Sequence, residues 1–295
     1  MGSLDVARST TSSRFGDARS WCLWRPLWRA GAAALLGYLI VVVVAMFLED
    51  SLIYFPVAYP EGDWQPPGLD IENAHFQAAD GTRLHGWYVP REHARAAVLF
   101  CHGNGGNVTH RVDALRKLHA LSGVSVLIFD YRGYGRSEGK PSEPGVVADA
   151  RAARAWLAQR EKIRESQVVL LGESLGGAVA VELAACDGAR ALILESPFSS
   201  LVDVAAHHYP FLPVRWALRT RFDAAAKIGN YRGPLLMAHG DADTIVPIQF
   251  GRRLFEAANE PKQFMLLPGH DHNDPMPPTY YGAVAEFLSA SDKRQ

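Results

Sequence analysis

Short apolar segments alternate with amphipathic helical patterns over most of this 295-residue chain. The strand-like segments cover residues 96–101, 124–129, 168–171, 191–194, 235–238 and 263–267, after a hairpin pattern at 75–79 and 84–89. The helical patterns cover residues 109–121, 145–160, 175–185, 248–258 and 280–289. Continuous apolar strands separated by helices are typical of a mostly parallel sheet covered on both faces. We therefore predict one α/β domain whose reactive groups lie on loops at the carboxyl ends of its strands.

An uncharged apolar run from Ala30 to Leu48 precedes this domain and is long enough to cross a membrane as a helix. The run ends in Met46-Phe47-Leu48, without the small-residue site of a cleaved signal peptide, and core helices rarely continue so far without a polar residue. Four arginines and three tryptophans precede it, and two acidic residues follow: Arg14, Arg19, Arg25, Arg29, Trp21, Trp24, Trp28, Glu49 and Asp50. The positive-inside rule then predicts an uncleaved single-pass signal-anchor, with a cytoplasmic N-terminus and an exported catalytic domain.

The chain accordingly divides into four parts. Residues 1–29 are predicted to be a disordered basic tail, 30–48 a transmembrane helix, 49–70 a proline-rich extended connector, and 71–291 the catalytic domain. Within the domain, the apolar and aromatic segment 197–222 lies between two predicted strands. It is expected to be either a short lid over an acyl pocket or an ordinary crossover.

Composition excludes several kinds of partner. The formal net charge of −1 offers no basic surface for nucleic acid. The three cysteines, Cys22, Cys101 and Cys186, are widely spaced, which favours neither a disulfide framework nor a zinc site. No His, Asp or Glu spacing demands a metal, so we expect neither a metal nor an organic cofactor.

The strand at 168–171 runs into Gly172-Glu173-Ser174-Leu175-Gly176, and a helical pattern follows at once. This G-x-S-x-G context places a serine on a tight strand-to-helix turn with its hydroxyl exposed. Glycines flank the serine because the turn leaves no room for side chains. We predict Ser174 as a nucleophile and the N–H of Leu175 as one donor of an oxyanion hole. Glu173 is expected to shape the turn without taking part in the chemistry.

A serine hydroxyl needs a base, and this fold supplies the acid and the histidine further along the chain. After the strand at 235–238 the chain carries two aspartates, Asp241 and Asp243, and after the last strand it carries two histidines, His270 and His272. Serine, acid and histidine thus follow three strands in the required order. The order alone leaves the choice within each pair open.

The motifs together resemble a known family. HGNGGN at 102–107, DYRGYGRSEG at 130–139, GESLGG at 172–177, HGDADTIVP at 239–247 and HND at 272–274 are similar to those of the α/β-hydrolase superfamily. More narrowly, residues 50–290 resemble the membrane-anchored, Bem46- and depalmitoylase-like branch, which includes bacterial hydrolases and eukaryotic protein depalmitoylases. The resemblance implies an α/β-hydrolase fold, Asp243 as the acid, His272 as the base and the N–H of Asn104 as the second oxyanion donor. His270 stays the alternative base.

These features predict a membrane-anchored serine hydrolase that cleaves a carboxylic ester or thioester through an acyl-enzyme. The expected substrate is a small-molecule or lipid acyl ester. Two alternatives stay open: a peptidase or amidase with the same triad, and a non-catalytic binding module on the same fold. A hydrolase with an aspartate nucleophile is excluded because residue 174 is serine.

Overall fold

The computed structural model describes residues 18–292, which fall into two compact units divided between Phe47 and Leu48. The first unit contains α1 (Ala18–Phe47). Within the described residues, one helical span, Pro26–Phe47, is long and apolar enough to cross a membrane. The prediction of a disordered tail over residues 1–29 is therefore wrong for residues 18–29, which belong to α1. The rest of that predicted tail, residues 1–17, lies outside the described residues.

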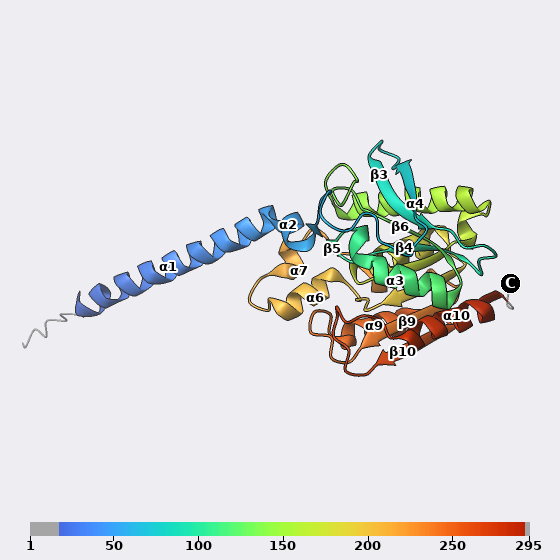
Figure 1. The fold of residues 1–295 in the computed structure, drawn as a ribbon. Helices are drawn as coiled ribbons and strands as arrows, with labels where there is room; N and C mark the ends of the chain where they lie inside the picture. The colour runs from blue at the N-terminus through green and yellow to red at the C-terminus, as the bar shows by residue number, and fades with distance from the viewer. Residues whose placement is uncertain (1–17, 293–295) are drawn as a thin grey trace, which may run out of the picture. The chain divides into compact units, whose positions relative to one another are not determined.

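The second unit is built around an eight-stranded sheet with the order β10-β9-β8-β7-β4-β6-β3-β2 (Figure 1). Its strands are β2 (Glu72–Gln77), β3 (Arg83–Val89), β4 (Ala97–Cys101), β6 (Ser125–Phe129), β7 (Val169–Glu173), β8 (Ala191–Glu195), β9 (Leu235–Gly240) and β10 (Lys262–Leu267). The six strands from β10 to β6 are parallel, whereas the β2–β3 hairpin joins the edge in the antiparallel sense. This confirms the predicted α/β architecture.

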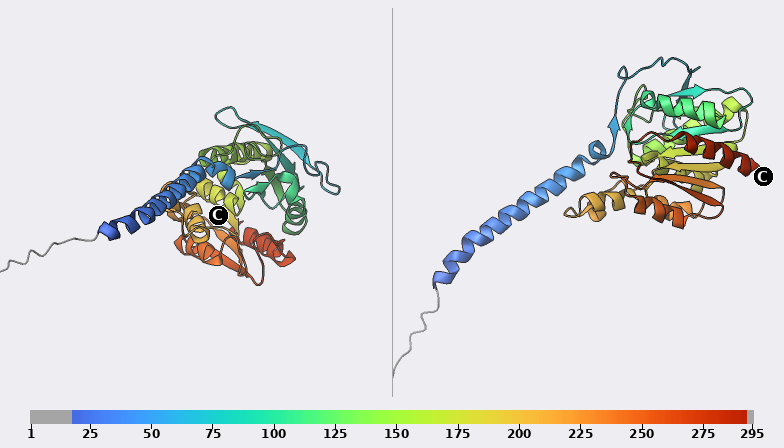
Figure 2. Two further views of the ribbon diagram at one scale, coloured as in Figure 1. Left: turned by 90° about the vertical axis from the view of Figure 1, so that its left-hand side faces the viewer. Right: turned by 60° about the horizontal axis from the view of Figure 1, so that its bottom comes forward.

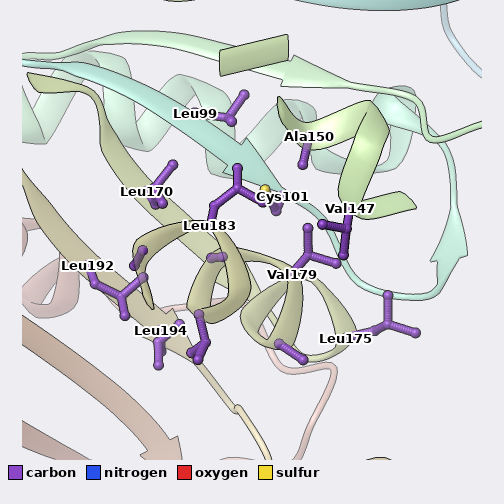
Figure 3. Packing of buried hydrophobic residues seen from close by; sticks show 14 of the residues in the cluster. Leu99, Cys101, Val147, Ala150, Leu170, Leu175, Val179, Leu183, Leu192 and Leu194 are labelled. Atoms are coloured by element: carbon purple, nitrogen blue, oxygen red, sulfur yellow. The ribbon is translucent and has the colours of Figure 1, made fainter. Parts of the chain in front are cut away.

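Helices cover both faces of the sheet (Figures 1 and 2). One face packs against α4 (Glu143–Glu161), α5 (Leu175–Asp187), α8 (Ala224–Ile228) and α9 (Ile248–Ala257), and the other against α3 (Val112–Lys117) and α10 (Pro278–Asp292). Figure 3 shows Leu99, Leu170 and Leu192 of three neighbouring strands facing Val179 and Leu183 of α5. The apolar strands are thus buried on both sides, as their uninterrupted hydrophobicity predicts.

The predicted helix at 109–121 is divided into three parts. A 3₁₀ turn (Val108–Arg111) leads into α3, and a π turn (Leu118–Ser122) follows it. The side chain of Asn107 accepts a hydrogen bond from the Thr109 N–H and starts the first turn, and Gly123, with φ of 69°, ends the last.

The segment after α1 packs into the second unit, which begins at Leu48. It forms α2 (Glu49–Ile53), where an extended connector is predicted, and then β1 (Phe55–Pro56). Ile53 and Tyr54 are buried, and β1 pairs in parallel with β5 (Gly105–Gly106). The stretch is therefore part of the structure that carries the site.

The segment 197–222, predicted as a lid or a crossover, contains α6 (Leu201–His208) and α7 (Val214–Ala217). Its base is closed by a hydrogen bond from the Leu201 N–H to the Arg221 carbonyl. The His208 ring also bonds the Ile245 carbonyl at 2.8 Å, which joins α6 to the loop after β9.

Candidate active site

Ser174 lies on the sharp turn between β7 and α5, with φ of 52° and ψ of −115°. A positive φ is costly for a residue with a Cβ, so the surrounding structure must impose it. The flanking glycines make the turn possible: a Cβ on Gly172 would lie 2.4 Å from the Gly176 carbonyl oxygen, and one on Gly176 would lie 2.0 Å from that of Cys101. Side chains at these two positions would push the turn apart.

The structure brings Ser174, His272 and Asp243 together from three loops. The Nε2 of His272 is 2.9 Å from the Ser174 Oγ, and its Nδ1 is 2.7 Å from the Asp243 Oδ2. The other carboxylate oxygen of Asp243 accepts the N–H groups of Ile245 and Val246, at 3.0 and 2.7 Å. The carboxylate is thus fixed by its own loop and can orient the imidazole, which in turn can take the serine proton.

A second histidine, His239, contacts the same carboxylate. Its Nε2 is 2.8 Å from the Val246 carbonyl oxygen and 3.3 Å from the Asp243 Oδ2, and its ring is fully buried. Burial raises the pKa of Asp243, but hydrogen bonds from His239 and His272 outweigh it and hold that pKa below its usual range. Asp243 therefore stays ionised beside the imidazole of His272.

Asp241 and His270, the alternatives to Asp243 and His272 in the sequence, contact backbone groups of the loops that follow β9 and β10. The Asp241 carboxylate accepts the Gly269 N–H at 2.6 Å, and the His270 Nδ1 lies 3.2 Å from the Pro268 carbonyl oxygen. Asp271 also joins the two loops, since its carboxylate accepts the N–H of Thr244 at 2.8 Å. These side chains shape the loops that carry Asp243 and His272.

The expected oxyanion donors lie where β4 meets the start of α5. Leu175 is the first residue of α5, and the first N–H groups of a helix have no partner within it. The close approach of Gly176 to the carbonyls of Cys101 and His102 places the start of the 102–106 loop directly against this helix end. The expected donors, the N–H groups of Leu175 and of this loop, therefore lie on adjoining segments.

Asn104 is held in this loop by the segment that follows α1. Its carbonyl accepts the Phe55 N–H at 3.0 Å and the Tyr134 hydroxyl at 2.7 Å, and its side-chain amide donates to the Ile53 carbonyl at 2.8 Å. Sequence reasoning did not anticipate this support, because a proline-rich stretch carries no signal for which loop it pairs with. The backbone of residues 53–55 thus fixes the loop expected to bind the oxyanion.

The sequence also gave no indication of Arg111, which forms a bidentate ion pair with Glu173. Its Nε and one terminal nitrogen lie 2.7 and 2.8 Å from the two carboxylate oxygens, and the same terminal nitrogen reaches the Gly105 carbonyl at 3.4 Å. Burial raises the pKa of Glu173, but the Arg111 charge outweighs it and leaves the pKa lowered. The pair ties the strand before the nucleophile to the oxyanion loop.

The chain is similar to known proteins in sequence and in fold. A family model described as serine aminopeptidase, S33 (Hydrolase_4) matches residues 92–221. An uncharacterised protein of Mycobacterium tuberculosis is 44% identical over 240 residues, covering 79% of this chain and 84% of the relative. The α/β-hydrolase domain-containing protein WAV2 of Arabidopsis thaliana is 32% identical (81% and 86% covered), and the protein bem46 of Schizosaccharomyces pombe is 29% identical (89% and 93% covered).

The chain belongs to the Bem46-like α/β-hydrolases. The esterase Pf2001 of Pyrococcus furiosus has the same fold, with a TM-score of 0.66 at 20% identity over 81% of this chain and 98% of the esterase. The predicted family and fold are thereby confirmed, and family membership supports hydrolase activity. Among the side chains that the structure describes, from residue 26 to residue 291, no group of three or more His, Cys, Asp or Glu is placed to hold a metal ion.

A further buried carboxylate, Glu195, lies beside the nucleophile strand of this α/β-hydrolase. It ends β8 in direct register with Glu173, and its carbonyl accepts the Ser174 N–H at 2.8 Å. Burial raises the pKa of Glu195 to about 7, and the nearby Glu173 carboxylate acts in the same direction. A carboxyl group that is protonated in the folded state near neutral pH makes stability depend on pH.

We expect Glu195→Gln to change that dependence. The usual pKa of a glutamate is 4.5, and that of Glu195 in the folded protein is about 7. Between these two pH values the folded wild type binds more protons than the unfolded chain, so its stability falls as pH rises. The variant lacks this contribution. The difference in the free energy of unfolding between variant and wild type should therefore shift in favour of the variant by roughly 2–3 kcal/mol from pH 4.5 to pH 8. Urea unfolding at both pH values measures it, and parallel pH profiles for the two proteins would contradict it.

Proposed function

We propose that this α/β-hydrolase is a membrane-anchored serine hydrolase that cleaves carboxylic esters or thioesters through an acyl-enzyme. The observation that carries the proposal is the continuous hydrogen-bonded chain from the Ser174 Oγ through both nitrogens of His272 to the buried carboxylate of Asp243. A serine at a strained turn, an imidazole within reach and an acid that orients it are what nucleophilic acyl transfer requires.

The reaction proceeds in two halves. The Ser174 Oγ attacks the carbonyl carbon while its proton moves to the Nε2 of His272, and Asp243 stabilises the imidazolium through Nδ1. The N–H groups of Leu175 and Asn104 stabilise the negative oxygen of the tetrahedral intermediate. His272 then protonates the departing alcohol or thiol. In the second half, water gives its proton to His272 and attacks the acyl-enzyme, and His272 returns that proton to the Ser174 Oγ as the acid departs.

The acyl preference can be measured with nitrophenyl esters of increasing chain length. We expect the full chain in detergent to hydrolyse these esters, with a preference for moderate or long acyl groups. The reason for this preference is that the apolar segment 197–222 follows β8, the neighbour of the strand β7 that precedes Ser174. The Ser174→Ala variant, prepared identically, is the control for contaminating esterases. Equal, slow hydrolysis of every ester by both proteins would contradict the proposal.

Amide hydrolysis is the second candidate, since the matching family model is described as a serine aminopeptidase. The same triad serves both reactions, and the leaving group decides between them. Aminoacyl nitroanilides compared with nitrophenyl esters at equal concentration separate the two. A higher kcat/KM on the anilides would replace the esterase proposal.

The anchoring part of the proposal rests on the exposed apolar span Pro26–Phe47 and on the charges around it. By the positive-inside rule, the arginines before the span favour a cytoplasmic N-terminus, with residues 49–295 on the other side. Alkaline phosphatase fused after Gln295 is therefore expected to be active, because it requires export. A fusion of green fluorescent protein at the same site that fluoresces in the cytoplasm would reverse the orientation.

A further inference from the structure

Three aromatic side chains are exposed on the α6–α7 segment, which follows the carboxyl end of β8. The side chain of Trp216 in α7 is 92% exposed, that of Phe211 is 69% exposed, and that of Tyr209 is half exposed. The rings of Tyr209 and Phe211 lie edge to face, with centroids 6.4 Å apart, so they form one cluster. Exposed aromatic clusters on a protein surface mark a site of contact with an apolar partner.

Basic residues lie next to these aromatic residues along the chain. Arg215, Arg219 and Arg221 are exposed on α7 and in the residues directly after it. Arg215 is 3.1 Å from the Asp203 carboxylate, and Arg219 is 3.3 Å from that of Glu49. Aromatic rings interleaved with arginines match the boundary of a membrane, where the rings enter the headgroup region and the guanidinium groups meet lipid phosphates.

Hydrogen bonds within the second unit join this segment to the start of α2. The buried carboxylate of Glu49 accepts the Thr220 N–H at 2.7 Å and the Arg219 N–H at 3.2 Å. Glu49 is two residues after Phe47, the last residue of the apolar span, so its Cα lies within about 8 Å of that residue's Cα. Chain connectivity therefore keeps residues 219 and 220, which follow α7, close to the boundary of any membrane that the span crosses.

From these observations we infer that Tyr209, Phe211 and Trp216, together with the exposed Leu52 of α2 and Leu48 just before it, form a lipid-contacting surface. This membrane-facing surface lies at the headgroup level of the bilayer that α1 crosses. The inference rests on the proposed anchoring and adds a second contact with the same membrane. The His208–Ile245 hydrogen bond joins α6 to the loop that carries Asp243, so the inferred surface and the candidate active site are on connected segments. The inference therefore also names a substrate class, an acyl ester held in the bilayer.

The test uses the full chain in vesicles of phosphatidylethanolamine and phosphatidylglycerol. Cys22 and Cys186 are replaced by serine, Cys101 is buried and left in place, and a Phe211→Cys substitution takes an environment-sensitive nitrobenzoxadiazole label. The matched control carries the label through Leu121→Cys, a 49% exposed leucine at the opposite, amino-terminal edge of the sheet. Vesicle flotation, label emission, quenching by lipid-borne nitroxide and quenching by aqueous iodide are measured on each protein.

We expect both proteins to float with the vesicles, and only the label at position 211 to shift to shorter wavelength and be quenched by the lipid nitroxide. Flotation without quenching at position 211 would overturn the membrane-facing surface and leave the anchor standing. A label at 211 that is shielded from aqueous iodide but not quenched by lipid would show a protein contact instead and would equally overturn it. Failure to float would remove both the surface and the anchoring.

Activity gives an independent measure of the same surface. Trp216→Ser should lower the rate on a long-chain ester dissolved in the vesicles, with unchanged kcat/KM on a water-soluble acetate ester, since residue 216 is outside the catalytic machinery. Leu121→Ser should change neither rate. Equal rates for Trp216→Ser and wild type on the vesicle ester would contradict the role of the surface in reaching membrane-held substrate.

Discussion

Ser174→Ala is expected to lower kcat/KM for esters by about 10⁴-fold or more and to abolish labelling by a fluorophosphonate probe. The substitution removes the atom that forms the acyl-enzyme and leaves the positive φ of the turn in place. The fold should therefore be kept, which circular dichroism and thermal unfolding can check. A folded Ser174→Ala protein that hydrolyses esters at the wild-type rate would show that the reaction takes place elsewhere.

The two histidines of the last loop provide a matched pair for this experiment. His272→Ala should cause a loss of similar size, because the base that accepts the serine proton is removed. His270→Ala should keep most of the activity, since the His270 ring contacts the Pro268 carbonyl in its own loop. A larger loss for His270→Ala than for His272→Ala would reverse the assignment of the base.

Deleting residues 1–59 is expected to abolish activity, whereas deleting residues 1–47 should preserve most of it on a water-soluble ester. The longer deletion removes β1 and the carbonyl of Ile53 that holds the Asn104 side chain, so the oxyanion loop loses its support. It also removes the buried side chains of Ile53 and Tyr54. Losing two such side chains costs about 5 kcal/mol or more, a large part of a typical domain's stability.

Fluorophosphonate labelling and the unfolding temperature of the two truncated proteins measure this difference. The shorter deletion ends where the second compact unit begins, which makes it the natural control. Equal labelling and equal unfolding temperatures for both would mean that the segment 48–59 contributes nothing to the site. An equal loss of activity in both truncated proteins, relative to the full chain, would instead assign the effect to the apolar span.

The sequence was sufficient to predict the elements whose residue pattern is local. The uninterrupted apolar run of β7 is typical of a strand buried on both faces. Gly172 and Gly176 indicate a turn that has no room for side chains at these two positions. Chain order then indicated a serine, an acid and a histidine on three loops. The choice between His270 and His272 needed the family resemblance, because both residues lie in one turn without periodicity.

Interactions between distant residues could not be predicted in this way. Arg111 and Glu173 are 62 residues apart, and neither position carries a pattern that indicates its partner. The pairing of β1 with β5 could not be predicted either. Two-residue strands are too short to show an alternation of apolar and polar residues, and the prolines around β1 favour irregular structure. Burial of Glu49 contradicts the ordinary preference of a carboxylate for water, and its partners are backbone N–H groups from residues 219 and 220.

The shared carboxylate of Asp243 has a consequence for the catalytic cycle. In the proposed cycle the imidazole of His272 accepts the proton of the Ser174 hydroxyl and then delivers it to the leaving group. The His239 ring is fully buried and contacts the Asp243 Oδ2, while two N–H groups hold the other oxygen. These contacts hold the acid in place without His272, so we expect Asp243 to keep its position and its charge while the His272 imidazole changes protonation state.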